Sequence, residues 1–359
     1  MLRSVARSLS IALRAAAGVV AIRRLIGVAS AAESVQPTDR DGLSISVVVP
    51  ARDEAGRIGP LLATIVGAPQ VAEVIVVDDQ STDATADIAR AAGAMVLVGS
   101  ELPDGWAGKA WALQQGIEMA SGRWVVTLDA DTRPDVQLPA ALVARASGDD
   151  LDLLTVAGRF DCPTVGSRWL HPAMLTTLVY RFGAPGSSSN RPMANGQCTV
   201  VPRQKFLDAG GMSSVSGEVV EDIALAHSVD ERGGNVAFLD ASDLLTVRMF
   251  ESFDDTWHGW GRSLALPGID GRCRQLFDLA VILLAQALPL PRLLFGRGDV
   301  IDVMMLAVRL GTLAGTRTAY ARVDAPYWAS PLADLPAVVA ITNGVRRGRA
   351  QVWRGRRYD

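Results

Sequence analysis

Two aspartates, one residue apart, directly follow a short apolar segment near the middle of the chain. Residues 124–128 read Trp-Val-Val-Thr-Leu, and Asp129 and Asp131 come next. The segment predicts a strand that is buried in a parallel sheet and cannot continue past Pro134, and ligands of such sheets bind beyond the carboxyl ends of the strands. Paired carboxylates at that position suit Mg²⁺ or Mn²⁺, which in turn binds substrate phosphates. The alternative is a solvated turn, where aspartate is also common.

Two earlier apolar segments also end in residues that are suited to binding. Residues 45–49 and 74–77 each predict a buried strand. Because the carboxyl ends of parallel strands meet at one edge of a sheet, we expect the residues that follow to gather beside Asp129 and Asp131. Carboxylates gathered in this way repel each other, so their grouping indicates a site for a cation and a polar nucleotide. The residues concerned are Pro50, Arg52, Glu54, Asp78 and Asp79.

Strand and helix segments alternate over the first half of the chain. Strands are predicted at 45–49, 74–77, 95–98 and 124–128, with helical segments between them. The alternation predicts right-handed βαβ units, and therefore an α/β fold with a Rossmann-like, mostly parallel central sheet flanked by helices. The first strand is followed by no Gly-x-Gly-x-x-Gly, and the sequence has no Gly-x-x-x-x-Gly-Lys-Ser/Thr loop. The P-loop class and the usual dinucleotide-binding class are therefore excluded.

One of only two lysines in the chain, Lys109, lies at the start of the helix predicted at 108–120. Its ammonium group and the free backbone N–H groups of the helix terminus are both suited to a phosphate. The alternative is a lysine on the helix surface. A second pair of acids, Glu221 and Asp222, opens the helix predicted at 221–231, where acids also serve simply to complement the helix dipole.

Composition excludes some classes of protein and indicates contact with a membrane. The chain has 359 residues, of which 49% are hydrophobic. The mean hydropathy of +0.22 is high for a soluble enzyme. A net charge of −3 argues against a general nucleic-acid binder. The three cysteines are far apart and odd in number, so they indicate neither a disulfide framework nor a zinc site.

Three sequence blocks together resemble the family 2 glycosyltransferases with the GT-A fold. They are Ser-Val-Val-Val-Pro-Ala-Arg-Asp-Glu at 46–54, Val-Val-Asp-Asp-Gln-Ser-Thr-Asp at 76–83 and Leu-Asp-Ala-Asp at 128–131, and they occur in the family's order and spacing. The resemblance covers about residues 44–265. It implies a nucleotide-diphosphate sugar donor, most often a UDP-sugar, and a divalent cation, Mn²⁺ or Mg²⁺.

The resemblance also implies roles for the residues at the strand ends. Pro50, Arg52 and Glu54 are expected to line the base and ribose pocket, and Asp79 to bind the nucleoside. Asp129 and Asp131 are expected to bind the diphosphate and the metal, with Asp131 preferred as the direct ligand. Lys109 completes the expected nucleotide-sugar site.

On the acceptor side, the resemblance rests on Asn-Gly-Gln at 195–197, Gly-Gly at 210–211 and Glu-Asp at 221–222. It implies that Gly196 and Gln197 face the acceptor and that Glu221 and Asp222 are the catalytic pair, with Asp222 as the base. A carboxylate within hydrogen-bond reach can take the proton of an acceptor hydroxyl as that oxygen attacks the anomeric carbon, with inversion.

The family often places an aromatic-plus-arginine motif over the acceptor and the diphosphate. The corresponding residues are Trp257, Trp260 and Arg262. This copy departs from the Gln/Arg-x-x-Arg-Trp motif of processive polysaccharide synthases, which puts polymer synthesis in doubt. The alternative is an amphipathic interfacial helix with Arg262 on its wet face.

Further blocks narrow the resemblance to the branch associated with carotenoid and hopanoid glycosylation. They are residues 105–113, residues 220–226 and the apolar C-terminal third. The implied reaction is transfer of one sugar to a hydroxyl or carboxyl group of a hydrophobic isoprenoid or other lipid. Two alternatives stay open. The first is a sugar nucleotidyltransferase, which would need a Gly-rich first loop that is missing after Val49. The second is a membrane scaffold that binds a nucleotide sugar without catalysis, and such a scaffold would not need Asp129, Asp131 and Asp222 together.

The N-terminal segment predicts a membrane-surface helix. Residues 1–32 carry five arginines and no acid, with Arg3, Arg7 and Arg14 on one helical face. We therefore expect residues 1–43 to be an amphipathic helix, lying on an anionic membrane surface, followed by a linker. A cleaved signal peptide ending near 29–31 is the alternative, although Arg14, Arg23 and Arg24 interrupt its apolar core.

The C-terminal segment, residues 266–359, is expected to contain membrane-associated helices and an Arg-rich tail, after a catalytic domain at 44–265. Residues 276–295 and 300–313 are apolar but are interrupted by prolines or charges, and neither reaches the ~20 apolar residues of a plain span. They predict short, kinked membrane helices or an interfacial platform. The Arg-rich tail favours the cytoplasmic side, which would place the catalytic domain on the cytoplasmic face of the cell membrane.

Overall fold

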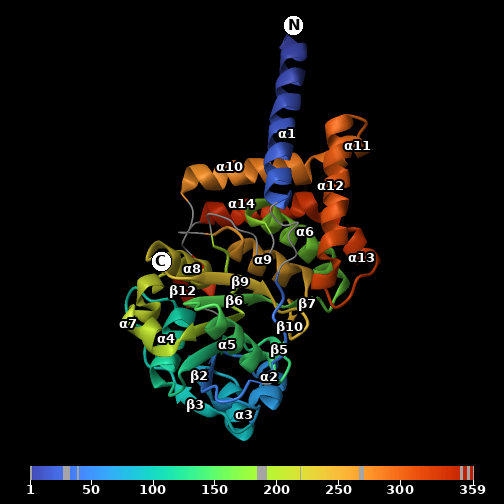
Figure 1. Ribbon diagram of the computed structural model, residues 1–359. Helices are drawn as coiled ribbons and strands as arrows, with labels where there is room; N and C mark the ends of the chain where they lie inside the picture. Colours follow the sequence, from blue (N-terminus) through green and yellow to red (C-terminus); the bar gives the residue numbers. More distant parts are fainter. Residues whose placement is uncertain are drawn as a thin grey trace. The chain divides into compact units, whose positions relative to one another are not determined.

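The structure is a computed structural model whose elements form two compact units (Figure 1). The first unit comprises residues 1–31, 161–189 and 249–349, and the second comprises residues 32–160, 190–248 and 350–359. The structure describes residues 2–26, 33–38, 40–183, 192–218, 220–266, 271–347, 351–353 and 356–358.

A seven-stranded sheet forms the centre of the second unit, in the order β3-β2-β1-β4-β8-β6-β9. Neighbouring strands are parallel, except that β8 runs antiparallel to both β4 and β6. The predicted α/β class with a mostly parallel central sheet is thus confirmed. The strands are β1 (Ile45–Ala51), β2 (Val71–Asp78), β3 (Met95–Val98), β4 (Trp124–Leu128), β6 (Leu153–Ala157), β8 (Cys198–Pro202) and β9 (Val236–Asp240).

The sheet is held by strands that are apolar on both faces. Every residue of β1 and β4 is buried. Full burial of a valine or isoleucine side chain contributes about 1.5–3 kcal/mol, so this run of β-branched residues fixes the two central strands. Helix α4 packs against β1 and β2, and α5 packs against β4, β6 and β8. The helices of this unit are α2 (Ile58–Ile65), α3 (Thr85–Ala91), α4 (Gly108–Met119), α5 (Leu138–Gly148), α7 (Arg203–Asp208) and α8 (Glu221–Glu231).

A second, three-stranded sheet was not expected from the sequence. Its order is β5-β10-β7, formed by β5 (Thr132–Pro134), β10 (Leu245–Arg248) and β7 (Arg159–Asp161). Chain extension therefore resumes just after Asp131, and Pro134 is the last residue of an edge strand, where a proline is tolerated. The backbone N–H of Arg248 donates to the carbonyl of Asp131 (3.0 Å), so this small sheet fixes the residues that follow β4.

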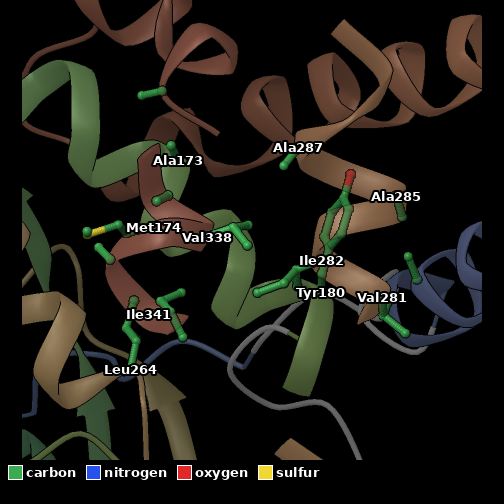
Figure 2. Close-up of a cluster of buried hydrophobic side chains, with 14 of the residues drawn as sticks. Ala173, Met174, Tyr180, Leu264, Val281, Ile282, Ala285, Ala287, Val338 and Ile341 are labelled. Atoms are coloured by element: carbon green, nitrogen blue, oxygen red, sulfur yellow. The ribbon is translucent and has the colours of Figure 1, made fainter. Parts of the chain in front are cut away.

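The first unit is helical. Its core cluster includes Met174 and Tyr180 of α6, Ile282 of α10 and Val338 of α14, shown in Figure 2. The principal helices are α1 (Leu2–Ile26), α6 (Val165–Phe182), α9 (Phe253–Ser263), α10 (Arg272–Ile282), α11 (Pro289–Leu294), α12 (Val300–Thr316), α13 (Ala325–Trp328) and α14 (Asp334–Arg347).

Contacts group the chain differently from the consecutive ranges expected from the sequence. Helices α6 and α9 fall within residues 44–265, yet they belong to the same unit as α1 and the C-terminal helices. The C-terminal helices range from 4 residues in α13 to 17 in α12, and a π-helical segment at Leu283–Ala287 separates α10 from Pro289. Among the described residues one helix is long and apolar enough to cross a membrane, and it is N-terminal: residues 5–26 of α1, with mean hydropathy 1.6.

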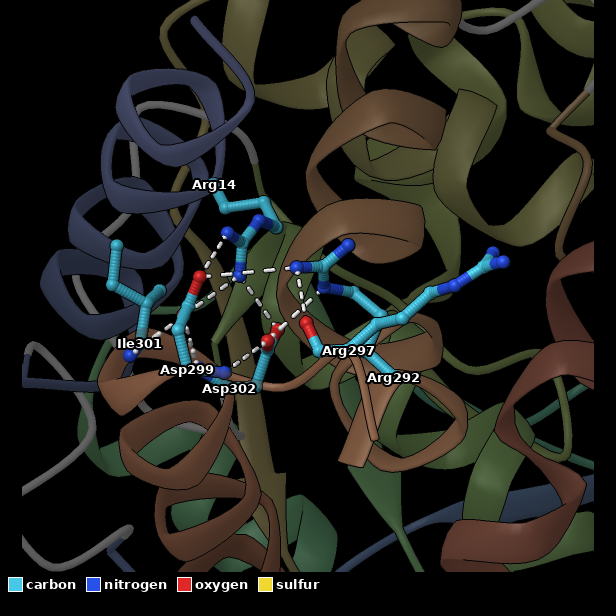
Figure 3. Close-up of polar contacts among 6 residues, drawn as sticks. All are labelled: Arg14, Arg292, Arg297, Asp299, Ile301 and Asp302. Carbon is cyan, nitrogen blue, oxygen red and sulfur yellow. Dashed lines mark hydrogen bonds and ion pairs between the residues drawn. The ribbon is translucent and has the colours of Figure 1, made fainter. Parts of the chain in front are cut away.

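The polar face expected for α1 is wrong at Arg14. This side chain is buried and forms ion pairs with Asp299 and Asp302 (Figure 3), whereas Leu9 and Leu13 are exposed. The acids that satisfy Arg14 lie almost three hundred residues away in the chain, at the start of α12. Helical periodicity within residues 1–32 therefore could not reveal which face of α1 is turned inward.

Candidate active site

A single ammonium group lies between the acids at the end of β4 and those at the start of α8. Lys109 Nζ is 2.8 Å from Asp129 Oδ1, 3.1 Å from Glu221 Oε1 and 3.3 Å from the carbonyl of Gly196. Burial lowers the pKa of Lys109, but Asp129 and Glu221 outweigh it and raise the pKa overall. Lys109 therefore remains protonated and holds the two carboxylates together.

Asp222 is held in one orientation by two backbone donors. The N–H of Gly196 donates to its Oδ2 (2.7 Å), and the N–H of Ile223 donates to its Oδ1 (2.8 Å). Burial, followed by the charge of Glu221, raises the pKa of Asp222 to about 6. A small, largely apolar cavity lies beside Glu221 and Asp222, and its other lining residues include Leu113, Ile117, Phe206, Met212 and Leu225.

The turn at Asn195–Gln197 connects the two groups of acids. While the N–H of Gly196 bonds to Asp222, the carbonyl of Gln197 accepts from the N–H of Asp129 (3.0 Å), and Asn195 Nδ2 donates to Gln197 Oε1 (2.8 Å). A Cβ atom on Gly196 would lie 3.1 Å from Lys109 Nζ and 3.2 Å from Asp222 Oδ2. These contacts would be tight, so glycine suits the close approach of Lys109 and Asp222 to the turn.

The predicted nucleotide-binding residues also come together. Pro50 pairs with Val77 in the sheet, and Arg52 Nη1 donates to the carbonyl of Asp79 (2.6 Å). The carboxylate of Glu54 raises the pKa of Asp131, which shows that this loop lies near the aspartates after β4.

Residues that fix these loops were missed at the sequence level. Asp53 adopts a positive φ of 52°, and its Oδ1 accepts from the N–H of Thr82 (2.7 Å). Asp83 Oδ2 accepts from the N–H of Ala55 (3.0 Å). Both aspartates lie inside the sequence blocks at 46–54 and 76–83. Aspartate is common in turns because its side chain binds nearby backbone N–H groups, and this preference could have indicated their role.

The donor atoms at Asp131 fit a divalent cation. Its Oδ1 is buried and has no hydrogen-bond partner within the described part of the chain. Burial, followed by Asp129 and Glu54, raises the pKa of Asp131 to about 7. A cation would remove this cost of burial and repulsion. No group of three or more His, Cys, Asp or Glu ligands is found among the described residues, so the protein alone does not form a cage. Mg²⁺ sites with one or two carboxylates that are completed by substrate phosphates match this arrangement.

Comparison with known proteins agrees with this geometry. Residues 46–207 match the model of the glycosyl transferase family 2. Over this range the chain is similar to the glycosyl transferase family 2. A curated relative from Staphylococcus aureus, named 4,4′-diaponeurosporenoate glycosyltransferase, is 28% identical over 232 residues, which are 62% of this chain and 61% of the relative. The chain thus spans about three fifths of that relative's length.

Two solved structures are similar to this chain to different degrees. A mannosyltransferase from Pyrobaculum calidifontis, in complex with GDP-Man and Mn²⁺, is 19% identical, covers 94% of this chain and 98% of its own, and has a TM-score of 0.58. A glucosyl-3-phosphoglycerate synthase from Mycobacterium tuberculosis, in complex with Mg²⁺ and UDP, is 21% identical, covers 66% of this chain and 85% of its own, and has a TM-score of 0.47. The first of these supports the GT-A fold.

The aromatic residues expected on the acceptor side lie on α9, in the first unit, whereas the other site residues belong to the second. The ring of Trp260 lies 3.9 Å from that of His171, and Trp257 stacks on Phe253 at 5.9 Å between centroids. Both tryptophans pack against the core of their own unit. Arg262 belongs to α9, but its side chain lies outside the described part of the structure. A role for these residues in acceptor binding stays a prediction.

Proposed function

We propose that the protein is an inverting, metal-dependent glycosyltransferase that moves one sugar from a UDP-sugar to a hydrophobic lipid or isoprenoid acceptor. The observation that carries this proposal is the Lys109 cluster, which joins Asp129 of the donor side to Glu221 beside the acceptor-side base Asp222. The cluster lies at the edge of the sheet in a family 2 domain, where a donor and an acceptor have to meet.

The donor side supplies binding and charge. Arg52, Glu54 and Asp79, together with Pro50, would contact the nucleoside, and Asp129 and Asp131 would hold a divalent cation with the diphosphate. When bound, the cation offsets the charge that develops on the departing nucleoside diphosphate. Lys109 adds the one ammonium group in this cluster. A diphosphate bound there can form an ion pair with this group in place of Asp129 or together with it.

The acceptor side supplies a base. As an acceptor hydroxyl attacks the anomeric carbon, a bond forms from its oxygen to that carbon, the bond from the carbon to the diphosphate breaks, and the proton passes to Asp222. With a pKa raised to about 6, Asp222 is ionised at neutral pH and is a stronger base than an ordinary aspartate. A carboxylate acceptor needs no base, and Asp222 would then orient it.

The nature of the acceptor is inferred from the relative and from the apolar helices. The relative's name gives 4,4′-diaponeurosporenoate as its acceptor, and α1 is apolar enough to enter a membrane. We place the enzyme at the cell membrane with its catalytic domain on the cytoplasmic face, as the Arg-rich tail favours.

The test is transfer to lipid by membranes that contain the protein. Labelled UDP-sugars, with GDP-mannose as a second nucleotide, are supplied with Mn²⁺ or Mg²⁺, and the extracted lipids are analysed by mass. We expect one lipid to gain the mass of one sugar, and the Asp131→Ala variant to form none of it. Release of pyrophosphate from UTP and a sugar phosphate would identify a nucleotidyltransferase instead. If no nucleotide sugar is consumed, the proposal is overturned in favour of a binding scaffold.

A further inference from the structure

The buried residues of α1 are small residues and one arginine. Arg14, Ala17, Gly18 and Ala21 are buried and recur at helical spacing. A Cβ atom on Gly18 would lie 2.8 Å from Met305 Sδ, so α1 and α12 approach each other closely at this point. Small residues at a close helix–helix contact are typical of packing inside membranes.

The charge of Arg14 is neutralised inside the unit (Figure 3). Its Nη1 is 2.7 Å from Asp302 Oδ1, and its Nη2 is 2.5 Å from Asp299 Oδ2. Asp302 is fully buried and also pairs with Arg292 Nε at 3.0 Å. Asp299 caps the start of α12 by accepting from the N–H groups of Ile301 and Asp302. The ion pairs therefore tie α1 to the N-terminus of α12.

The outward face of the same helices is apolar. Leu9 is 59% exposed and Leu13 is 52% exposed, one turn apart on α1. Residues 5–9 are exposed on every side of the helix, and the N-terminal part of α1 (dark blue) projects beyond the other helices of its unit in Figure 1. Further large exposed side chains lie on the neighbouring helices: Phe277, Leu294, Phe295, Val300, Val303 and Met304.

Charges inside and large aliphatic side chains outside are the reverse of what water favours. In hydrocarbon, ionisable side chains face the interior of a bundle and pair with one another, and apolar side chains face the lipid. At 1.5 Å per residue, the 25 residues of α1 measure about 37 Å, enough to enter a hydrocarbon layer of about 30 Å.

We propose that α1 is a permanent lipid-facing helix, locked to α12 by Arg14, whose exposed apolar side contacts acyl chains. This rests on the proposed function in that the acceptor is delivered from a lipid phase. Two consequences separate it from the alternatives. The helix stays on the protein, unlike a signal peptide. Its binding to a bilayer needs no anionic lipid, because Arg14 and Arg24 pair with Asp302 and Asp278 within the protein, and the exposed apolar side chains, rather than the exposed Arg7 and Arg23, supply the contact with acyl chains.

The experiment is flotation of the full chain with vesicles of phosphatidylcholine alone. We expect the protein to float with them, to remain bound in 1 M salt, where charges separated by more than ~3 Å are screened, and to retain its N-terminal segment by intact mass. Leu9→Glu combined with Leu13→Glu should lower the bound fraction by more than about tenfold, because a charge in hydrocarbon is costly. Val98→Glu combined with Met119→Glu, at exposed apolar positions of the second unit, should leave it unchanged.

Arg14→Met tests the lock itself. We expect α1 to become accessible to protease when the protein is moved from vesicles into detergent, while Arg7→Met, at an exposed position of the same helix, leaves protection unchanged. UDP binding is measured on every variant, so a failure of the family 2 site is seen separately from a failure of flotation. Binding only to anionic vesicles, loss of residues 1–31, or self-association through Leu9 and Leu13 without flotation would each overturn the proposal.

Discussion

In the second unit, β1 and β4 bury valine, isoleucine and leucine, and the buried acids Asp78, Asp79 and Glu221 gather where strands end and helices begin. In the first unit, arginines and aspartates are themselves buried, as Arg309 with Asp334 and Arg14 with Asp302. Of the 23 large hydrophobic side chains that are exposed among the described residues, 19 belong to the first unit. Buried charge thus lies at the candidate active site in one unit and cross-links helices in the other.

In the second unit, Asp222→Asn should have the largest effect on sugar transfer. The amide keeps the shape of the carboxylate but cannot accept the proton, so we expect transfer to a hydroxyl to fall by about 10²- to 10⁴-fold while UDP binding is retained. Single-turnover transfer and a UDP titration check the two parts. The matched control is Asp230→Asn, an exposed aspartate on the same helix. Unchanged transfer in Asp222→Asn would mean that Asp222 is not the base.

Arg309→Met should have the largest effect on the structural side. Arg309 Nε lies 2.9 Å from Asp334 Oδ2, and both side chains are almost fully buried. Removing one partner of a buried pair leaves an uncompensated charge and costs about 3–5 kcal/mol. We expect a clear fall in the thermal midpoint of the protein in lipid, and partial recovery when Asp334→Leu is added.

The control for this cross-link is an exposed pair of the same type in the second unit. Arg90 and Asp87 are 3.0 Å apart with both side chains solvated, so Arg90→Met should cost at most about 1 kcal/mol. Equal effects of Arg90→Met and Arg309→Met would remove the distinction between the two units.

Lys109→Met should weaken donor binding by a smaller factor. The change removes the ammonium group that faces Asp129 and Glu221 and leaves these acids to repel a diphosphate. Loss of a hydrogen bond to a charged group costs about 1.5–3 kcal/mol, which is roughly a 10- to 150-fold loss of affinity for UDP with metal. Lys205→Met removes the only other lysine, which is largely exposed, and should bind UDP normally. Equal binding of UDP by both variants would show that Lys109 has only a structural role.

The pH profile gives the finest test. A base with a pKa of about 6 is protonated below that value, so transfer to a hydroxyl should fall about tenfold per pH unit on the acid side. Because the charge of Glu221 helps to raise this pKa, Glu221→Gln should move the inflection to lower pH. An inflection that stays in place in Glu221→Gln would show that another group is titrating.

The sequence predicted the parts whose structure is set locally. Apolar segments flanked by glycine and aspartate located β3 and β4 at their observed bounds, and the acids that follow β1, β2 and β4 were expected at one edge. The three short strands β5, β7 and β10 were missed, because each has only three or four residues and depends on pairing between distant segments.

Partners at long range were the other limit. Lys109 was placed correctly at a helix start, but its contact with Glu221 joins residues more than a hundred positions apart. The inward turn of Arg14 is set by Asp299 and Asp302 in the same way. Residue type and periodicity indicate which groups need a partner, and only the folded chain shows which partner each group finds.

The turn at Gly196 has a consequence for timing. Its N–H donates to the carboxylate of Asp222, and the carbonyl of Gln197 accepts from the N–H of Asp129, so two peptide units of one short turn, separated by a single peptide unit, contact both groups of acids. If a bound nucleotide displaced Asp129, it would also displace the backbone of residues 195–197, which orients the carboxylate of Asp222. Binding of the donor would then change the orientation of the Asp222 carboxylate at the same time.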